Sequence, residues 1–244
     1  MHENLAITNL LNYLFGPFIV SVMNMLGIHP AHPDAPINNA FALEVAVAAG
    51  LVLFFLIVRF TLSVEKPNPA QHVAEIIHEF TGSTADQIIG HGYERFQAFV
   101  TCVFLFVVIN NLLGLVPGLH TPTADPVVPL GIALCTFVYY NFYGFKEQGF
   151  VGYMKHFAGP IWWIAWLLFP IEIISHCARM MSLTIRLYAN MFASDLVTLV
   201  FFSLVPIAIP AIFLGLHTFV SLIQAYVFML LAMIYLSEAV AHEH

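Results

Sequence analysis

Charge is scarce in this chain of 244 residues: only 9% are charged, whereas 60% are hydrophobic. Soluble domains carry about 25% charged residues, so this chain cannot cover itself with a surface that water wets. Several stretches reach the roughly 20 apolar residues that a bilayer crossing needs. The composition therefore excludes a soluble globular domain. It predicts an all-α polytopic membrane protein that forms a single membrane domain over residues 1–244 and has the lipid bilayer as its surroundings.

Cysteines and glycine-rich loops are also few or missing. The three cysteines, Cys102, Cys135 and Cys177, lie within apolar segments, which argues against a disulfide framework. No glycine-rich phosphate loop occurs, and the first ten residues lack the basic region of a signal peptide, so we expect the first segment to be retained. We expect no ATP site, no metal or cofactor and no nucleic-acid partner.

Hydropathy along the chain predicts five membrane helices and one surface helix. The membrane helices are expected at residues 38–62, 95–117, 127–146, 170–203 and 210–240. Residues 70–90 place apolar side chains on one helical face and charged ones on another, which predicts an amphipathic helix on the membrane surface. Residues 1–37 form an interfacial or membrane segment. Its apolar stretch 5–27 contains Asn, Gly and Pro, and both possibilities stay open.

Basic residues test this topology because the chain has only seven of them. Five fall on one side of the five-helix arrangement: Arg59, Lys66, Arg95, Lys146 and Lys155. Basic loops face the cytoplasm, so this side and the C-terminus are predicted to be cytoplasmic. Arg179 and Arg186 remain within the fourth predicted helix, where an arginine at the bilayer centre costs about 2.5–3.5 kcal/mol on insertion scales. Arg179 can be a structural ion-paired residue, whereas Arg186 lies too deep to reach the interface.

A polar stripe follows one side of the fourth predicted helix. Its members recur every three or four residues: Glu172, Ser175, Arg179, Ser182, Arg186 and Asn190. Asp195 departs from the stripe, because nine residues after Arg186 it lies on the opposite side of the helix and about 13 Å further along. Glu172 lies about 21 Å in the other direction. An acid toward each membrane face with an arginine between them indicates two separate polar routes, not one continuous pore.

The fifth predicted helix carries a second stripe, formed by His217, Ser221 and Gln224. The break at Val205–Pro210 makes the last two helices an antiparallel hairpin, in which His217 reaches the depth of Asp195 and Gln224 that of Asn190. A histidine on a membrane helix is more often a hydrogen-bonded packing residue, but one that faces a carboxylate favours a proton relay. Both interpretations of His217 stay open.

Length distinguishes the last two predicted helices from the others. At 1.5 Å per residue, residues 170–203 extend about 50 Å and residues 210–240 about 46 Å, against roughly 30 Å of hydrocarbon. An ordinary tilt of about 20° cannot absorb this excess. We therefore expect a steeply inclined pair that lies along the side of a partner.

Three segments resemble one known family. "SLTIRLYANMFASDL", "HTFVSLIQAYVFMLLAMIYLSEAVAHEH" and "NNLLGLVPGLHTPTADP" resemble subunit a of the F-type ATP synthase, and the resemblance runs from about residue 70 to the C-terminus. It implies a non-catalytic stator subunit that offers two proton half-channels to the carboxylates of a c-subunit ring and couples proton flow to rotation and ATP synthesis. It also implies contacts with the b subunits of a peripheral stalk and the remainder of the complex. The expected location is a bacterial plasma membrane rather than an organelle inner membrane.

The resemblance also implies roles for individual residues. The family's essential arginine falls on Arg186, and its other proton-translocating positions fall on Asn190, Asp195, His217, Gln224, Glu172 and Ser175. Secondary candidates are Arg179, Ser182, Ser221, Asp125 and His176. Some members carry an acid where this chain has Gly114, which leaves more of the outer route to Asp195, His217 and Asp125.

Two other functions remain open from the residues alone. One is a stand-alone ion carrier or channel. The other is a membrane cytochrome that uses His176 and His217 as haem ligands, although it leaves Arg186 and Asp195 without roles. Residues of a ring largely determine the coupling ion, so H⁺ and Na⁺ are both compatible with this chain.

Overall fold

The computed structural model describes residues 5–25, 35–63, 66–116, 119, 121–158, 165–204 and 208–240. Within these ranges the regular structure is helical throughout, so the all-α prediction is confirmed. The helices are α1 (Ala6–Met25), α2 (Asn39–Phe60), α3 (Pro69–Ile89), α4 (Glu94–Leu112), α5 (Val127–Ala158), α6 (Ala165–Leu204) and α7 (Ala208–Val240), with short 3₁₀ helices η1 (Leu113–Leu115) and η2 (Pro122–Ala124). The C-terminal residues 241–244, expected on the cytoplasmic side, lie outside the described residues.

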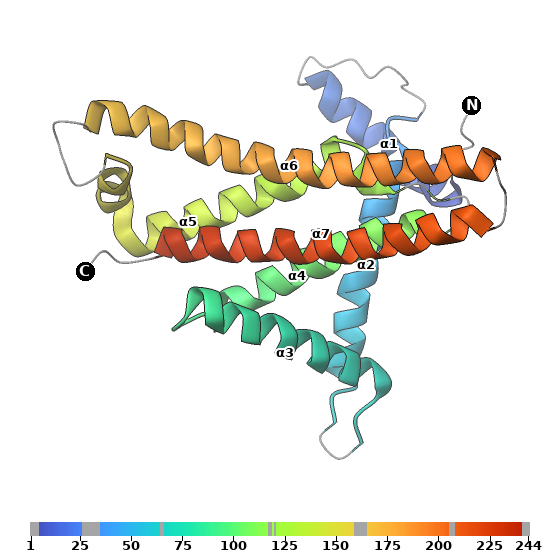
Figure 1. Ribbon diagram of the computed structural model, residues 1–244, viewed down its shortest axis with the longest axis horizontal. Helices are drawn as coiled ribbons and strands as arrows, with labels where there is room; N and C mark the ends of the chain where they lie inside the picture. The colour runs from blue at the N-terminus through green and yellow to red at the C-terminus, as the bar shows by residue number, and fades with distance from the viewer. Residues whose placement is uncertain are drawn as a thin grey trace.

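Six of these helices are long and apolar enough to cross a membrane. Five correspond to the predicted membrane helices, and the sixth is α1, which lies in the segment that the sequence left open. In Figure 1, α1 lies at one end of α2 and α3 at the other. The chain is a multi-pass membrane protein.

The long pair α6 and α7 packs side by side along the longest axis of the molecule and runs across α2 (Figure 1). With 40 and 33 residues, these helices extend about 60 and 50 Å. Neither helix can stand upright in a bilayer that α2 crosses, because both run across α2 and are longer than the hydrocarbon layer. The predicted inclined hairpin is therefore confirmed. Pro170 was expected to begin the fourth helix, but it lies inside α6. Membrane helices tolerate an internal proline because side chains and neighbouring helices satisfy the freed backbone groups.

Helix α5 bends where the sequence predicted its end. The predicted membrane segment stopped at residue 146, and the helical backbone is interrupted at Gly149 with φ of +70°. Only glycine adopts this conformation without steric cost. The bend therefore separates the apolar part of α5 from the segment that follows.

The core lies between α4, α5, α6 and α7. From α6, Leu183, Leu187 and Met191 are buried against it, one turn apart. Ile185 and Phe192, on the same helix, stay exposed. One side of α6 thus packs within the chain, while the other presents apolar side chains to lipid or to another protein.

Helix α3 has the amphipathic character that was predicted, together with a packing stripe that was not. Its apolar residues Val73, Ile76 and Phe80 are exposed, as expected for a face that meets lipid. A separate stripe packs on α4, where Thr81 Oγ1 lies 2.8 Å from Thr101 Oγ1. Gly82 allows this approach, because a Cβ there would lie 2.5 Å from the amide nitrogen of the Gln97 side chain.

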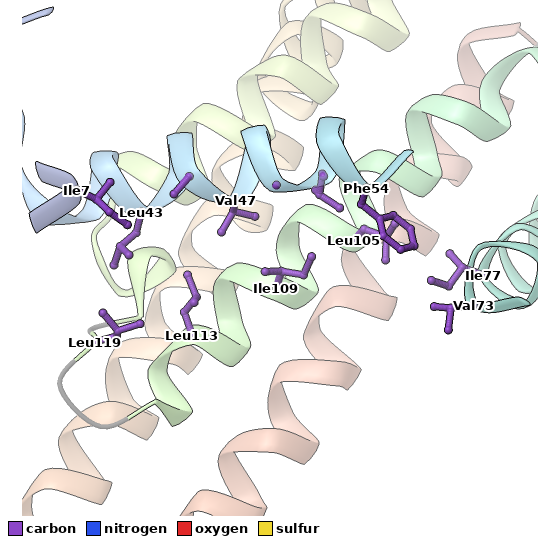
Figure 2. Close-up of a pocket in the computed structure, with 13 residues that line it drawn as sticks. Ile7, Leu43, Val47, Phe54, Val73, Ile77, Leu105, Ile109, Leu113 and Leu119 are labelled. Carbon is purple, nitrogen blue, oxygen red and sulfur yellow. The ribbon is translucent and has the colours of Figure 1, made fainter. Parts of the chain in front are cut away.

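An apolar cavity of about 560 Å³ lies between α2 and α4, with residues of α1, α3 and η1 also lining it. Figure 2 shows Leu43, Val47 and Phe54 of α2 facing Leu105 and Ile109 of α4 across it. All of its lining side chains are apolar or glycine. An apolar space does not stabilise a charged species. The polar side chains lie instead on the other side of α4, along α6 and α7.

Candidate functional site

The first polar cluster forms where α6 and α7 meet the end of α4 and the segment around η2. We call it the His217 cluster; its members are Asn111, Thr121, Thr123, Ser194, Asp195 and His217. The sequence had singled out only the last two. The other four have hydroxyl or amide side chains. They lie close to one another because of the path that the chain takes between α4 and α5.

His217 lies at the centre of this cluster and is 1% exposed. Its Nε2 is 3.0 Å from the backbone oxygen of Asn111, and its Nδ1 is 2.8 Å from Ser194 Oγ. Asp195 Oδ1 lies 3.5 Å from the same Nδ1. The expected match in depth between His217 and Asp195 is therefore confirmed, and the ring is both hydrogen-bonded and next to a carboxylate.

Asp195 is held by the segment that precedes η2. Thr121 Oγ1 donates a 3.0 Å hydrogen bond to Asp195 Oδ1. A Cβ added at Gly114 would lie 1.9 Å from Thr121 Oγ1 and 3.4 Å from Asp195 Oδ1. A side chain at residue 114 would therefore displace Thr121, and the carboxylate of Asp195 already lies at the place that an acid there would reach. This packing gives a physical reason for the glycine.

Asn111 joins three elements through its side chain and its backbone. Thr123 donates a 2.6 Å hydrogen bond to Asn111 Oδ1, and Asn111 Nδ2 lies 3.4 Å from the backbone oxygen of Ser221. Ser221 itself is buried, and its hydroxyl points to Met191 Sδ at 3.8 Å. Ser221 thus contributes its carbonyl to the cluster, whereas its hydroxyl faces the core.

Arg186 lies one turn from a pair that bridges the hairpin. Asn190 Nδ2 donates a 2.9 Å hydrogen bond to Oε1 of Gln224, which confirms their expected match in depth. Arg186 is half-buried, and its Nη2 lies 3.4 Å from Ser182 Oγ. No carboxylate in the described part of the chain forms an ion pair with it. The guanidinium is thus a fixed charge without a compensating partner within those residues.

A second polar cluster lies toward the other end of α6; we call its members Tyr140, Glu172 and His176 the His176 cluster. His176 Nε2 is 3.3 Å from Glu172 Oε1, and its Nδ1 is 3.0 Å from the hydroxyl of Tyr140. Tyr140 is buried, while the Glu172 side chain is 35% exposed. Ser175 is half-buried beside them. His176 is thus less enclosed than His217, whereas Glu172 and Asp195 are about equally exposed.

Two secondary candidates have structural partners. Arg179 forms an ion pair with Glu238 of α7 and lies over the ring of Tyr235, 5.2 Å from its centroid. Asp125 Oδ1 accepts a 3.2 Å hydrogen bond from the backbone nitrogen of Val127 at the start of α5. The first contact joins the hairpin, and the second caps a helix.

The contacts of the two histidines argue against haem ligation. In each of His176 and His217, both ring nitrogens lie within 3.3 Å of protein oxygen atoms. A haem iron would need one of these nitrogens free. Across the described residues, no group of three or more His, Cys, Asp or Glu is placed to hold a metal ion.

A family model described as ATP synthase A chain matches residues 41–237, which include both clusters and Arg186. The chain belongs to this family. It is 52% identical over 245 residues to ATP synthase subunit a of Koribacter versatilis, a match that covers 100% of both chains. ATP synthase subunit a of Solibacter usitatus is 44% identical over 95% of this chain and 100% of its own length. That of Sulfurimonas denitrificans is 40% identical over 81% and 88%.

Membership of the ATP synthase A chain family confirms the resemblance seen in the three sequence segments. The matched region begins inside α2 and ends inside α7, so it contains the inclined hairpin and all residues of the two clusters. Glu238, the partner of Arg179, lies one residue beyond it. The stand-alone carrier and the cytochrome are not favoured.

Proposed function

We propose that this chain is the non-catalytic stator subunit of a rotary ATP synthase and offers two proton half-channels to the carboxylates of a c-subunit ring. One observation carries the proposal. Arg186, a permanent cation on a membrane helix, has no ion pair within the described residues and stands between the two polar clusters. A charge at membrane depth without a partner is costly, so a carboxylate from another subunit is the natural complement.

The chemistry of arginine explains why this residue suits the separating position. The guanidinium does not lose its proton in proteins, so Arg186 cannot pass protons along. It attracts a rotor carboxylate and favours the ionised form of that carboxylate. Its positive charge also opposes proton transfer directly between the two clusters. A fixed cation therefore keeps the two routes apart while the ring moves past.

The two clusters supply the ends of the route. A proton enters from the outer side through the His217 cluster, passes Asp195 and neutralises a ring carboxylate near Asn190 and Gln224. The neutral site can then turn into lipid. After nearly a full turn it releases its proton on the side of Glu172. Each charge that crosses 100 mV contributes about 2.3 kcal/mol, so several protons are needed per ATP.

The shape of the chain supports the same assignment. The inclined pair α6 and α7 offers a long exposed apolar surface along which a ring can move, with Ile185 and Phe219 among its residues. The basic residues Arg59, Arg95, Lys146 and Lys155 support the proposal that their side of the membrane, and with it the C-terminus, faces the cytoplasm of a bacterial cell. The b subunits of the peripheral stalk hold this chain against rotation.

Replacement of Arg186 by alanine tests the proposal. In vesicles that contain the assembled complex, Arg186→Ala is expected to abolish ATP synthesis and to let protons flow passively, because nothing then keeps a neutral ring site from moving between the routes. Thr184→Ala is a matched control on α6, since the Thr184 hydroxyl donates to the backbone oxygen of Met180 within its own helix. Substantial ATP synthesis by the alanine variant would overturn the proposal.

A second measurement separates the stator from a stand-alone carrier. The detergent-solubilised chain is expected to copurify with a small ring-forming proteolipid. If the isolated chain alone moved protons at the rate of the complex, the carrier would be the better description.

A further inference from the structure

We infer that His217 gains and loses the transported proton at Nδ1 alone, and that the Ser194 hydroxyl is the residue that positions this nitrogen. The inference rests on the proposed proton route and deepens it. Neither the tautomer of the ring nor Ser194 followed from the sequence, because both depend on how the end of α4 meets the hairpin.

The first step is the contact at Nε2. A backbone carbonyl oxygen can only accept a hydrogen bond. Asn111 O lies 3.0 Å from Nε2 of His217, so this nitrogen has to carry a hydrogen both in the neutral ring and in the charged one. In the neutral state the remaining nitrogen, Nδ1, therefore has the lone pair.

The second step is the surroundings of Nδ1. Ser194 Oγ lies 2.8 Å away, and a hydroxyl can donate or accept. It donates to Nδ1 when the ring is neutral and accepts from Nδ1 when the ring is charged, by rotation about the Cβ–Oγ bond. Asp195 Oδ1, at 3.5 Å, lies beyond a good hydrogen bond to the neutral ring but attracts the charged one.

The third step is the rigidity of the ring. Asn111 lies in the last turn of α4, where backbone carbonyls lack partners within the helix. Its side chain is held by Thr123 and by the backbone oxygen of Ser221. Because His217 is 1% exposed, a flip of the ring would break both of its hydrogen bonds at a buried position, where lost hydrogen bonds are costly.

These contacts exclude a relay through the ring, in which a proton enters at one nitrogen and leaves from the other. The proton instead returns from Nδ1 to the side from which it came, which faces Ser194 and Asp195. His217 therefore acts as a temporary store beside Asp195, and the continuous path runs past the ring along α6. This arrangement differs from a chain of groups that each pass a proton onward.

The tautomer can be measured without reference to transport. Solid-state ¹⁵N NMR on the assembled complex, with labelled histidine and a His217→Gln sample to assign the signals, reports the protonation of each ring nitrogen. We expect Nε2 protonated and Nδ1 unprotonated in the neutral ring, and both protonated in the charged ring. A neutral ring with its hydrogen on Nδ1 would contradict the inference even if the proposed function holds.

The role of Ser194 is tested by three variants of the complex in vesicles. Ser194→Ala is expected to lower ATP-driven proton pumping roughly tenfold, the effect of losing one hydrogen bond to a charged group, while Ser194→Thr restores most of it. Thr184→Ala is the matched control on the same helix, because the Thr184 hydroxyl donates to the backbone oxygen of Met180 and does not contact Ser194. Equal pumping by Ser194→Ala and the wild type would overturn this role, as would equal loss in the alanine and threonine variants. Failure of the proposed function would appear elsewhere, as ATP synthesis by Arg186→Ala.

Discussion

The His217 cluster and the His176 cluster both form around α6, yet they are built differently. Residues from α4, the η2 segment, α6 and α7 enclose His217, which is 1% exposed. The members of the His176 cluster come from α5 and α6. The side chains of His176 and Glu172 are 12% and 35% exposed, against 2% and 31% for His217 and Asp195. The two acids are thus about equally exposed, and the clusters differ in how fully their histidines are enclosed and in how many elements surround them. Substitutions in the His217 cluster should therefore have the larger effects.

Arg186 lies between the two clusters, so its replacement should have the largest effect on ATP synthesis. Lysine is the second variant to test there, after Arg186→Ala. Arg186→Lys should also abolish ATP synthesis although it keeps a basic group, because a lysine can lose its proton when desolvated and lacks the planar guanidinium. The measurement is ATP synthesis in reconstituted vesicles under an imposed proton gradient. If lysine supported synthesis at half the wild-type rate or more, the planar guanidinium would not matter, and charge alone would explain the site.

Replacement of Asp195 tests the His217 cluster. Asp195→Asn removes the carboxylate but keeps an acceptor for Thr121, so the complex should assemble while ATP-driven pumping falls roughly tenfold or more. Asp125→Asn is a control with a nearby acid, since Asp125 caps α5 and is expected to leave pumping close to the wild type. Wild-type pumping in assembled Asp195→Asn complexes would remove Asp195 from the route.

Replacement of Glu172 tests the His176 cluster, where a smaller effect on pumping is expected. Glu172→Gln should lower pumping by only about twofold to threefold, because His176 beside it is less enclosed than His217 and water can replace the acid more easily there. A loss as large as that of Asp195→Asn would erase the contrast between the two clusters.

A labelling experiment tests which side of the membrane the His176 cluster faces. The native cysteines Cys102, Cys135 and Cys177 are all exposed and must first be replaced. Glu172→Cys should then react with a hydrophilic thiol reagent added from the cytoplasmic side. Ile173→Cys, a neighbouring exposed apolar position, is the control expected to react less. Reaction from the outer side alone would reverse the topology.

The pair formed by Arg179 and Glu238 should give the smallest effect. Its side chains are 26% and 50% exposed, and pairs of this kind contribute about 0.2–1 kcal/mol. Arg179→Gln and Glu238→Gln should each slightly lower the temperature at which the hairpin leaves the complex, and the double variant should lose little more. Pumping should stay near the wild type. Strictly additive losses would show that the two residues do not act as a pair.

Periodicity explains which parts of the site could be predicted. The stripe on α6 and the matched depths of Asn190 and Gln224 follow from regular spacing on two helices that lie close together in the sequence, which local geometry determines. The excess length of the hairpin likewise predicted its inclination. The α3 helix was predicted from the same kind of pattern, but its packing stripe around Thr81 was not, because small and hydroxyl residues have no distinct signal in hydropathy.

The sequence by itself determined that the chain enters a membrane, where its helices lie, and that α6 carries an arginine between two acids. These properties depend on composition and on the repeat of a single helix. Only the tertiary structure decided that Thr121 bonds to Asp195, that Asn111 holds the ring of His217, and that Arg179 pairs with Glu238. Such contacts join residues far apart in the chain, and the irregular segment between α4 and α5 has no periodicity from which its position could be computed.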